Sequence, residues 1–267
     1  MIGRLPIAKM FAATVVLTVL ISVVMVPIRW NGSGASTAAP DIDRLLDVMI
    51  VLSAFVFALV MVMLAYALYK FRAKPGDESD GEPIHGNTRL EIAWTLIPTI
   101  IVLFGAGYSW AVLDEIEEPA ENPLKVQVFA QQFAWSFGFP GKEEAWSEGE
   151  VHVPLDRQVQ FKLHGMDVIH SFWVPEWRIK KDAVPGITTT ATVTPNKAGT
   201  YQLVCTELCG VGHATMRATV VVEPAADFRK WVEGLEQKVP EPLAQVVTEK
   251  AEENAAPQGG AEEPAGA

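Results

Sequence analysis

Three long runs of apolar residues lie in the first half of the chain, and they constrain its fold more than any other feature. The runs cover residues 10–28, 48–68 and 92–113. A helix needs about 20 apolar residues to cross a bilayer, and the second and third runs are each long enough. Hydrophobic residues make up 49% of the chain and its mean hydropathy is +0.20, which is unusual for a protein that is soluble throughout. We therefore predict a transmembrane helical hairpin over residues 41–114.

The first apolar run has two interpretations. It follows Arg4 and Lys9 and carries no charge, as the apolar part of a signal peptide does. Its length lies between that of a signal peptide and that of a spanning helix. The small residues over 32–39 offer a cleavage zone. Residues 1–38 are therefore either a signal peptide or a further transmembrane helix.

Basic residues predict how the hairpin is oriented. Lys70, Arg72, Lys74 and Arg89 lie between the second and third runs. An excess of Lys and Arg marks a loop as cytoplasmic. We therefore expect a multi-pass protein of the plasma membrane, with everything after Leu113 on its outer side.

The pattern changes after Asp114 from long apolar runs to short segments rich in β-forming residues. Turn signals such as Pro140-Gly141 and Pro185-Gly186 separate them. This spacing predicts an all-β sandwich of the Greek-key type over residues 115–225. The expected strands cover residues 125–131, 150–153, 159–163, 168–174, 187–194, 200–204 and 218–222.

The last part of the chain predicts a helix and a tail. Residues 226–239 indicate a C-terminal amphipathic helix with Phe228, Trp231, Val232 and Leu235 on one face. Residues 240–267 are rich in Ala, Glu, Pro and Gly, which predicts a disordered acidic tail. The net charge of −11 argues against a nucleic-acid partner, because phosphates are bound by clustered Lys and Arg.

Potential metal ligands gather in one short segment. Cys205, Cys209, His213 and Met216 lie between two predicted strands, and His170 lies on another predicted strand. Two cysteines in an exported domain commonly form a disulfide. Alternatively, the two cysteines and two histidines would complete a tetrahedral zinc site. Neither alternative gives Met216 a role.

Copper is the third alternative for the same segment. A thioether is a soft ligand, and a set of thiolate, imidazole and Met is typical of cupredoxin electron-transfer sites. With two cysteines in place of one, the thiolates can bridge two copper ions. Each ion would then take one His and one weak ligand, Met216 or a backbone carbonyl that Glu207 is placed to give. An electron shared by two metals changes each bond less, which favours fast electron transfer.

Four separated strings are similar to motifs of cytochrome c oxidase subunit II, a component of haem–copper oxidases. The resemblance spans roughly residues 41–238. The strings are Glu-Ile-Ala-Trp-Thr-Leu-Ile-Pro at 91–98, Asp-Val-Ile-His-Ser-Phe-Trp-Val-Pro at 167–175, Lys-Lys-Asp-Ala-Val-Pro-Gly at 180–186, and Cys-x-Glu-x-Cys-Gly-x-x-His-x-x-Met at 205–216.

The resemblance implies a dinuclear copper (CuA) centre that receives electrons from cytochrome c and passes them to haem in subunit I. Oxygen is reduced in subunit I with proton pumping, so this chain would have no catalytic residue of its own. The implied copper ligands are His170, Cys205, Cys209, His213, Met216 and the carbonyl of Glu207. The carboxylate of Glu207 would help to hold magnesium at the subunit I boundary, and Glu91 would lie at the entrance of a proton pathway. No Cys-x-x-Cys-His motif is present, so we expect no haem in this chain.

The chain departs from the family pattern where electrons would enter. Phe133 stands at the position of the Trp thought to receive them, and Trp135 matches the next Trp of the family. Phe133 would then pack the docking patch while Trp135 braces the copper loop, or the donor is not a typical cytochrome c. A strand that packs Trp135 into the core is the structural alternative. For Glu91 the alternative is a solvated acid at a helix start.

Other roles for these residues also remain open. Asp167 and Asp182 are either part of an acidic docking face or turn residues, and His152 and His164 are expected to be ordinary surface or core histidines. For the whole chain, the alternatives are a quinol oxidase subunit without copper, a nitric oxide reductase subunit and a membrane-tethered copper-binding module. All the copper ligands are present, which argues against the quinol oxidase.

Overall fold

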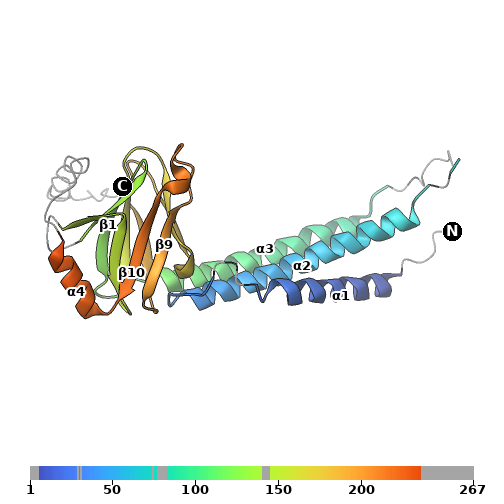
Figure 1. Cartoon of the computed structure of the whole chain (residues 1–267). Helices are drawn as coiled ribbons and strands as arrows, with labels where there is room; N and C mark the ends of the chain where they lie inside the picture. Colours follow the sequence, from blue (N-terminus) through green and yellow to red (C-terminus); the bar gives the residue numbers. More distant parts are fainter. Residues whose placement is uncertain are drawn as a thin grey trace, which may run out of the picture. The chain divides into compact units, whose positions relative to one another are not determined.

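The computed structural model describes residues 6–28, 30, 32–73, 75–76, 83, 85–139 and 145–235. The predicted disordered tail lies outside these residues. The chain divides into two compact units, residues 1–118 and 119–267. Helices form the first unit and a β-sandwich with one helix forms the second (Figure 1). The predicted fold class is confirmed.

The first unit contains three helices, α1 (Ile7–Met25), α2 (Ala39–Lys70) and α3 (Thr88–Glu117). Each is long and apolar enough to cross a membrane. Most of their large apolar side chains are exposed, as expected for surfaces that lipid covers. α1 packs along α2, and the buried side chains of these two helices are all small: Thr14, Ala39, Ala54 and Ala58. Small residues let helix backbones approach closely.

The sandwich consists of two five-stranded sheets. The first has the order β3-β2-β1-β5-β8 and the second has the order β4-β10-β9-β6-β7. The pairs β1/β5 and β4/β10 are parallel and the other pairs are antiparallel. The strands are β1 (Leu124–Gln131), β2 (Ala134–Gly138), β3 (Trp146–Glu148), β4 (Glu150–Pro154), β5 (Val159–Gly165), β6 (His170–Val174), β7 (Ile179–Ala183), β8 (Thr189–Val193), β9 (Gly199–Cys205) and β10 (Arg217–Glu223).

Alternation of apolar and polar residues builds the core between the sheets. In β10, for example, Ala218, Val220 and Val222 are buried, while the residues between them are partly exposed. Successive side chains of a strand point to opposite faces, so one face of each sheet becomes apolar. The largest fully buried side chains include Trp135, Phe137, Phe161, Phe172 and Trp177.

Three strands were missing from the sequence prediction. β2 contains Trp135 and corresponds to the strand given above only as the structural alternative for that residue. All of its residues after Ala134 are buried, so it lacks alternation. β3 has only three residues, and β7 is a largely polar edge strand, Ile-Lys-Lys-Asp-Ala. Two predicted strands were too long, because β6 begins at His170 and β8 at Thr189. Short, buried or edge strands leave little periodic signal.

The C-terminal helix α4 (Ala225–Gly234) packs on the sandwich. Of the helix predicted over residues 226–239, the last four residues lie outside the described part of the chain. Phe228 and Trp231 contact Phe139, with ring centroids 6.2 and 5.3 Å apart. The ring of Trp231 also stacks on His152 at 4.0 Å.

Candidate metal centre

The ends of three strands position the predicted ligands. Cys205 is the last residue of β9, Met216 directly precedes β10, and His170 is the first residue of β6. The backbone N–H of Cys205 donates to the carbonyl of Met216 at 3.1 Å, which closes the base of the loop between β9 and β10. Phe172 pairs with Cys205 across β6 and β9, so His170 lies beside this loop.

A short 3-10 turn forms the far side of the ligand loop, which we define as residues 206–216. The turn covers His213–Thr215, and the N–H of Met216 donates to the carbonyl of His213 at 3.2 Å. Side chains three residues apart lie on the same side of a 3-10 helix. His213 and Met216 are therefore presented together.

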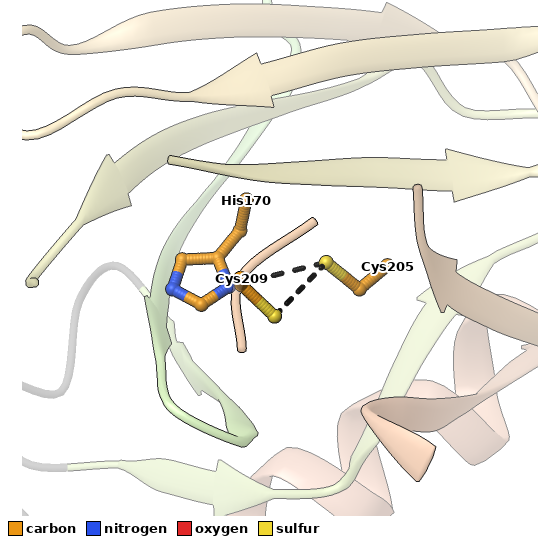
Figure 2. A group of neighbouring side chains, drawn as sticks. All are labelled: His170, Cys205 and Cys209. Atoms are coloured by element: carbon orange, nitrogen blue, oxygen red, sulfur yellow. Dashed lines mark hydrogen bonds between the residues drawn. The ribbon is translucent and has the colours of Figure 1, made fainter. Parts of the chain in front are cut away.

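The sulfur atoms of Cys205 and Cys209 lie at the centre of the site. They are 3.9 Å apart, well beyond the roughly 2.05 Å of a disulfide bond, and both cysteines are free. Each residue is 3% exposed. The imidazole of His170 lies beside the two cysteines (Figure 2), with its Nδ1 atom 3.9 Å from the Cys205 sulfur. The ligand atoms of these three residues lie within 4.8 Å of one another.

The other predicted donors surround the same pair of sulfurs. The Cys209 sulfur lies 3.5 Å from Nδ1 of His213 and 3.8 Å from the sulfur of Met216. The Cys205 sulfur lies 3.4 Å from the carbonyl oxygen of Glu207. Donors that share one ion at about 2.0–2.3 Å in tetrahedral geometry are roughly 3.3–3.8 Å apart. The residues therefore fit a metal centre.

Asp167 fixes the orientation of His170. Its Oδ1 lies 2.8 Å from Nε2 of His170, which leaves Nδ1 facing Cys205. Burial alone would raise the pKa of Asp167, but hydrogen bonds from His170 and from the backbone N–H groups of Gln132 and Val168 outweigh it, so the pKa is lowered. A carboxylate that holds the second nitrogen of a ligating His is a common feature of metal sites.

Burial also affects the protonation of the Cys209 thiol in the metal-free chain. It raises the pKa of Cys209 to about 11, and the neighbouring Cys205 adds to the rise. A cation must displace protons from such thiols in order to bind them. The site is therefore suited to soft metal ions that bind thiolate strongly.

The two aromatic residues of the expected electron path lie at different places. Trp135 is fully buried, and its ring lies edge-on to His170 at 6.2 Å. Phe133 is partly exposed and lies against the ligand loop: a Cβ atom on Gly212 would come within 2.5 Å of its ring. Of the two, it is therefore Phe133 that contacts the loop backbone.

Other predicted site residues lie elsewhere. Glu91 is in the first turn of α3, where its Oε1 accepts a hydrogen bond from the backbone N–H of Asn87 at 3.0 Å. The side chain of Asn87 in turn accepts from the N–H groups of Arg89 and Leu90, which caps the helix. Glu207 is exposed.

Asp182, His152 and His164 are engaged within the sandwich. Asp182 accepts a hydrogen bond from the hydroxyl of Ser171 at 2.6 Å. His164 lies 2.7 Å from the side-chain oxygen of Gln127. The sequence reasoning missed two other contacts, that of Asp167 with His170 and that of Gln132 with the ligand loop. For Asp167 a signal existed, because it precedes His170 by three residues.

These features define a membrane-anchored protein with a cupredoxin-like sandwich and a soft-metal site. Two family models match the chain: "Cytochrome C oxidase subunit II, transmembrane domain" over residues 28–112 and "Cytochrome C oxidase subunit II, periplasmic domain" over residues 145–224. The cytochrome c oxidase subunit 2 of Synechocystis is 32% identical, over 81% of this chain and 81% of its own length. The chain belongs to the cytochrome c oxidase subunit II family, and it is therefore a subunit of a haem–copper oxidase with a copper-binding periplasmic domain.

Further similar proteins carry the same name. Subunit 2 from Alkalihalophilus pseudofirmus is 37% identical, over 73% of this chain and 57% of its own length. Among solved structures, the periplasmic domain of subunit II of the Bradyrhizobium japonicum cytochrome oxidase is 27% identical. That structure covers 44% of this chain and 95% of its own, with a TM-score of 0.42.

Proposed function

We propose that this chain is the electron-entry subunit of a cytochrome c oxidase and that its sandwich holds two copper ions. Cys205 and Cys209 would bind both ions. The remaining donors would be His170, His213, Met216 and the backbone carbonyl of Glu207. When bound, the ions supply a one-electron redox centre whose charge is shared by two metals. The observation that carries the proposal is the convergence of these six donors, with contacts of 3.4–3.9 Å to the two sulfurs.

Met216 favours copper over zinc. Its thioether is fully buried and lies 3.8 Å from the Cys209 sulfur. Zinc would be satisfied by two thiolates and two imidazoles, which leaves the thioether without a role. Copper accepts thioether and carbonyl oxygen as weak additional ligands.

The surrounding residues of the chain would keep the site rigid and dry. Burial excludes water from the two sulfurs, and Asp167 keeps the imidazole of His170 in one tautomer. A site that moves little when its charge changes has a small reorganisation cost. The sandwich therefore favours fast electron transfer at small driving force.

The remaining roles concern partners and the membrane. The donor would be cytochrome c on the outer side of the plasma membrane, and the acceptor would be haem in subunit I, where oxygen is reduced and protons are pumped. Trp135 and Phe133 would carry electrons toward the copper ions. Glu91 would lie at the entrance of a proton path, and the carboxylate of Glu207 would bind magnesium at the subunit I boundary.

Copper loading of the full-length chain in detergent tests the proposal. We expect two copper ions per chain and an electron spin resonance spectrum with hyperfine splitting from two equivalent nuclei. Binding of one zinc ion in preference to copper, or a stable disulfide between Cys205 and Cys209 after loading, would overturn it. Met216→Leu keeps the bulk of the side chain but removes the thioether, so it should change the spectrum while both ions remain bound.

A further inference from the structure

Gln132 lies in the turn between β1 and β2, outside the set of metal donors, yet it contacts both segments that carry them. Its side-chain Nε2 donates a hydrogen bond to the backbone carbonyl of Cys209. Its backbone N–H donates to Oδ2 of Asp167 at 2.7 Å. The other oxygen of Asp167 holds His170 at 2.8 Å. One residue thus connects the ligand loop to the strand end that carries His170.

The neighbouring residue supports the same contact. The ring of Phe133 lies against Gly210 and Gly212 of the ligand loop. At Gly210, a Cβ atom would come within 2.9 Å of Nε2 of Gln132 and 3.1 Å of the Phe133 ring. Gly210 also has a φ of +131°, which side chains rarely adopt. The absence of side chains at both glycines therefore lets the β1–β2 turn approach the backbone of the loop.

We propose that Gln132 is a positioning residue that holds the carbonyl of Cys209, and with it the Cys209 sulfur, in place relative to His170. The hydrogen bond fixes the backbone on one side of Cys209, while the pairing of β9 with β6 and β10 already fixes Cys205. Cys209 lies in the loop between strands, so it depends on such a contact more than Cys205 does. The spectroscopic consequence rests on the proposed copper centre, whereas the effect on the free thiols does not.

The reactivity of the buried thiols measures this role without any metal. In the copper-free, full-length chain in detergent, a thiol-specific reagent reacts only when the loop opens, because both cysteines are 3% exposed. Gln132→Met keeps the length of the side chain but removes its N–H donors. We expect Gln132→Met and Gln132→Ala to react roughly three- to tenfold faster than the wild type, the factor that corresponds to one lost hydrogen bond.

Gln202→Ala is the matched control. Gln202 is an exposed residue of β9, the strand that ends at Cys205, and its substitution should leave the rate unchanged. Wild-type rates in both Gln132 variants would overturn the inference. A fast Gln132→Ala with a wild-type Gln132→Met would also overturn it, because bulk rather than the hydrogen bond would then be what matters.

Copper-loaded protein gives a second, independent readout. We expect Gln132→Met to bind copper but to show unequal hyperfine splitting from the two nuclei, since the Cys209 sulfur is displaced relative to His170. A spectrum identical to the wild type would contradict the positioning role. Failure of the wild-type chain itself to bind copper would instead contradict the proposed function, and the thiol rates would still decide the role of Gln132.

Discussion

A histidine contacts a carboxylate in each of two regions of the sandwich. In one of these regions an imidazole nitrogen remains available to a metal, and in the other both nitrogens are occupied. Near α4, both ring nitrogens of His152 face carboxylates, Glu223 at 2.7 Å and Glu150 at 2.8 Å. In the ligand region, Asp167 takes one nitrogen of His170 and the other faces Cys205. A ligating nitrogen must keep its lone pair free. The comparison shows that the number of acceptors around the ring separates a structural histidine from a candidate ligand.

The regions also differ in what lies over the ring. Trp231 stacks flat on His152, with an interplanar angle of 9°, which joins α4 to the sheet. Trp135 meets His170 edge-on at 65° and lies entirely in the core. The first contact holds a peripheral helix, whereas the second packs one side of the metal site. Substitutions in the two regions should therefore affect different properties.

The largest effect is expected at the two thiols that we propose to bridge the copper ions. Cys209→Ser replaces a soft ligand with a weak one, and we expect complete loss of the two-nucleus spectrum in full-length protein loaded with copper. His152→Gln is the control from the other region and should keep the wild-type spectrum. If Cys209→Ser kept the two-nucleus spectrum, the proposed bridging role of Cys209 would be wrong.

Asp167 should have the next largest effect. Asp167→Ala leaves His170 without the partner that sets its tautomer, and copper affinity should fall about 10- to 100-fold. Asp167→Asn keeps an acceptor oxygen without the charge, so it should lose less. Competition with a copper chelator measures both affinities. Equal affinities for all three proteins would remove the distinction between the two histidine regions.

A smaller effect is expected where the β1–β2 turn touches the loop. Gly212→Ala places a Cβ atom against the ring of Phe133, and overpacking of this kind typically costs about 1–3 kcal/mol. Copper release from the full-length protein should be faster than in the wild type. Gly234→Ala is the control, because no atom lies within 4 Å of a Cβ atom at Gly234 and, as at Gly212, its φ lies outside the left-handed region. Similar release from both variants would mean that the contact of the added Cβ atom with Phe133 does not affect the site.

The smallest effect on the metal is expected from the α4 region. His152→Gln should leave copper affinity unchanged but loosen α4, because it removes a ring that contacts two carboxylates and stacks on Trp231. Hydrogen exchange of the α4 amides should become roughly tenfold faster, as expected for about 1.4 kcal/mol. Exchange at the wild-type rate in the variant would show that the contacts of Phe228 and Trp231 with Phe139 hold the helix without His152.

Much of the fold could be predicted from the sequence, because its apolar runs are long and several of its strands alternate regularly between apolar and polar residues. The apolar runs predicted the spanning helices, and alternation in segments such as β10 predicted strands. β2 and β7 are not among the predicted strands, because neither shows alternation. β2 is buried along nearly all its length, and β7 is a largely polar edge strand. Their assignment depends on which neighbours they pair with, and those neighbours are distant in sequence.

The candidate site also combines residues that the sequence predicts with contacts that only the structure reveals. Residue chemistry and spacing alone predicted that Cys205, Cys209, His213 and Met216 are metal ligands, because one short segment contains all four. That His170 reaches the same sulfurs was only a possibility until β6 paired with β9. The contacts of Asp167 and Gln132 depend on three loops meeting at one end of the sandwich. The sequence by itself determined the candidate donors of the loop and the apolar helices, since both depend on local composition. Tertiary structure decided what holds the loop, since the contacts of Gln132 with Asp167 and Cys209 join residues 35 and 77 positions apart.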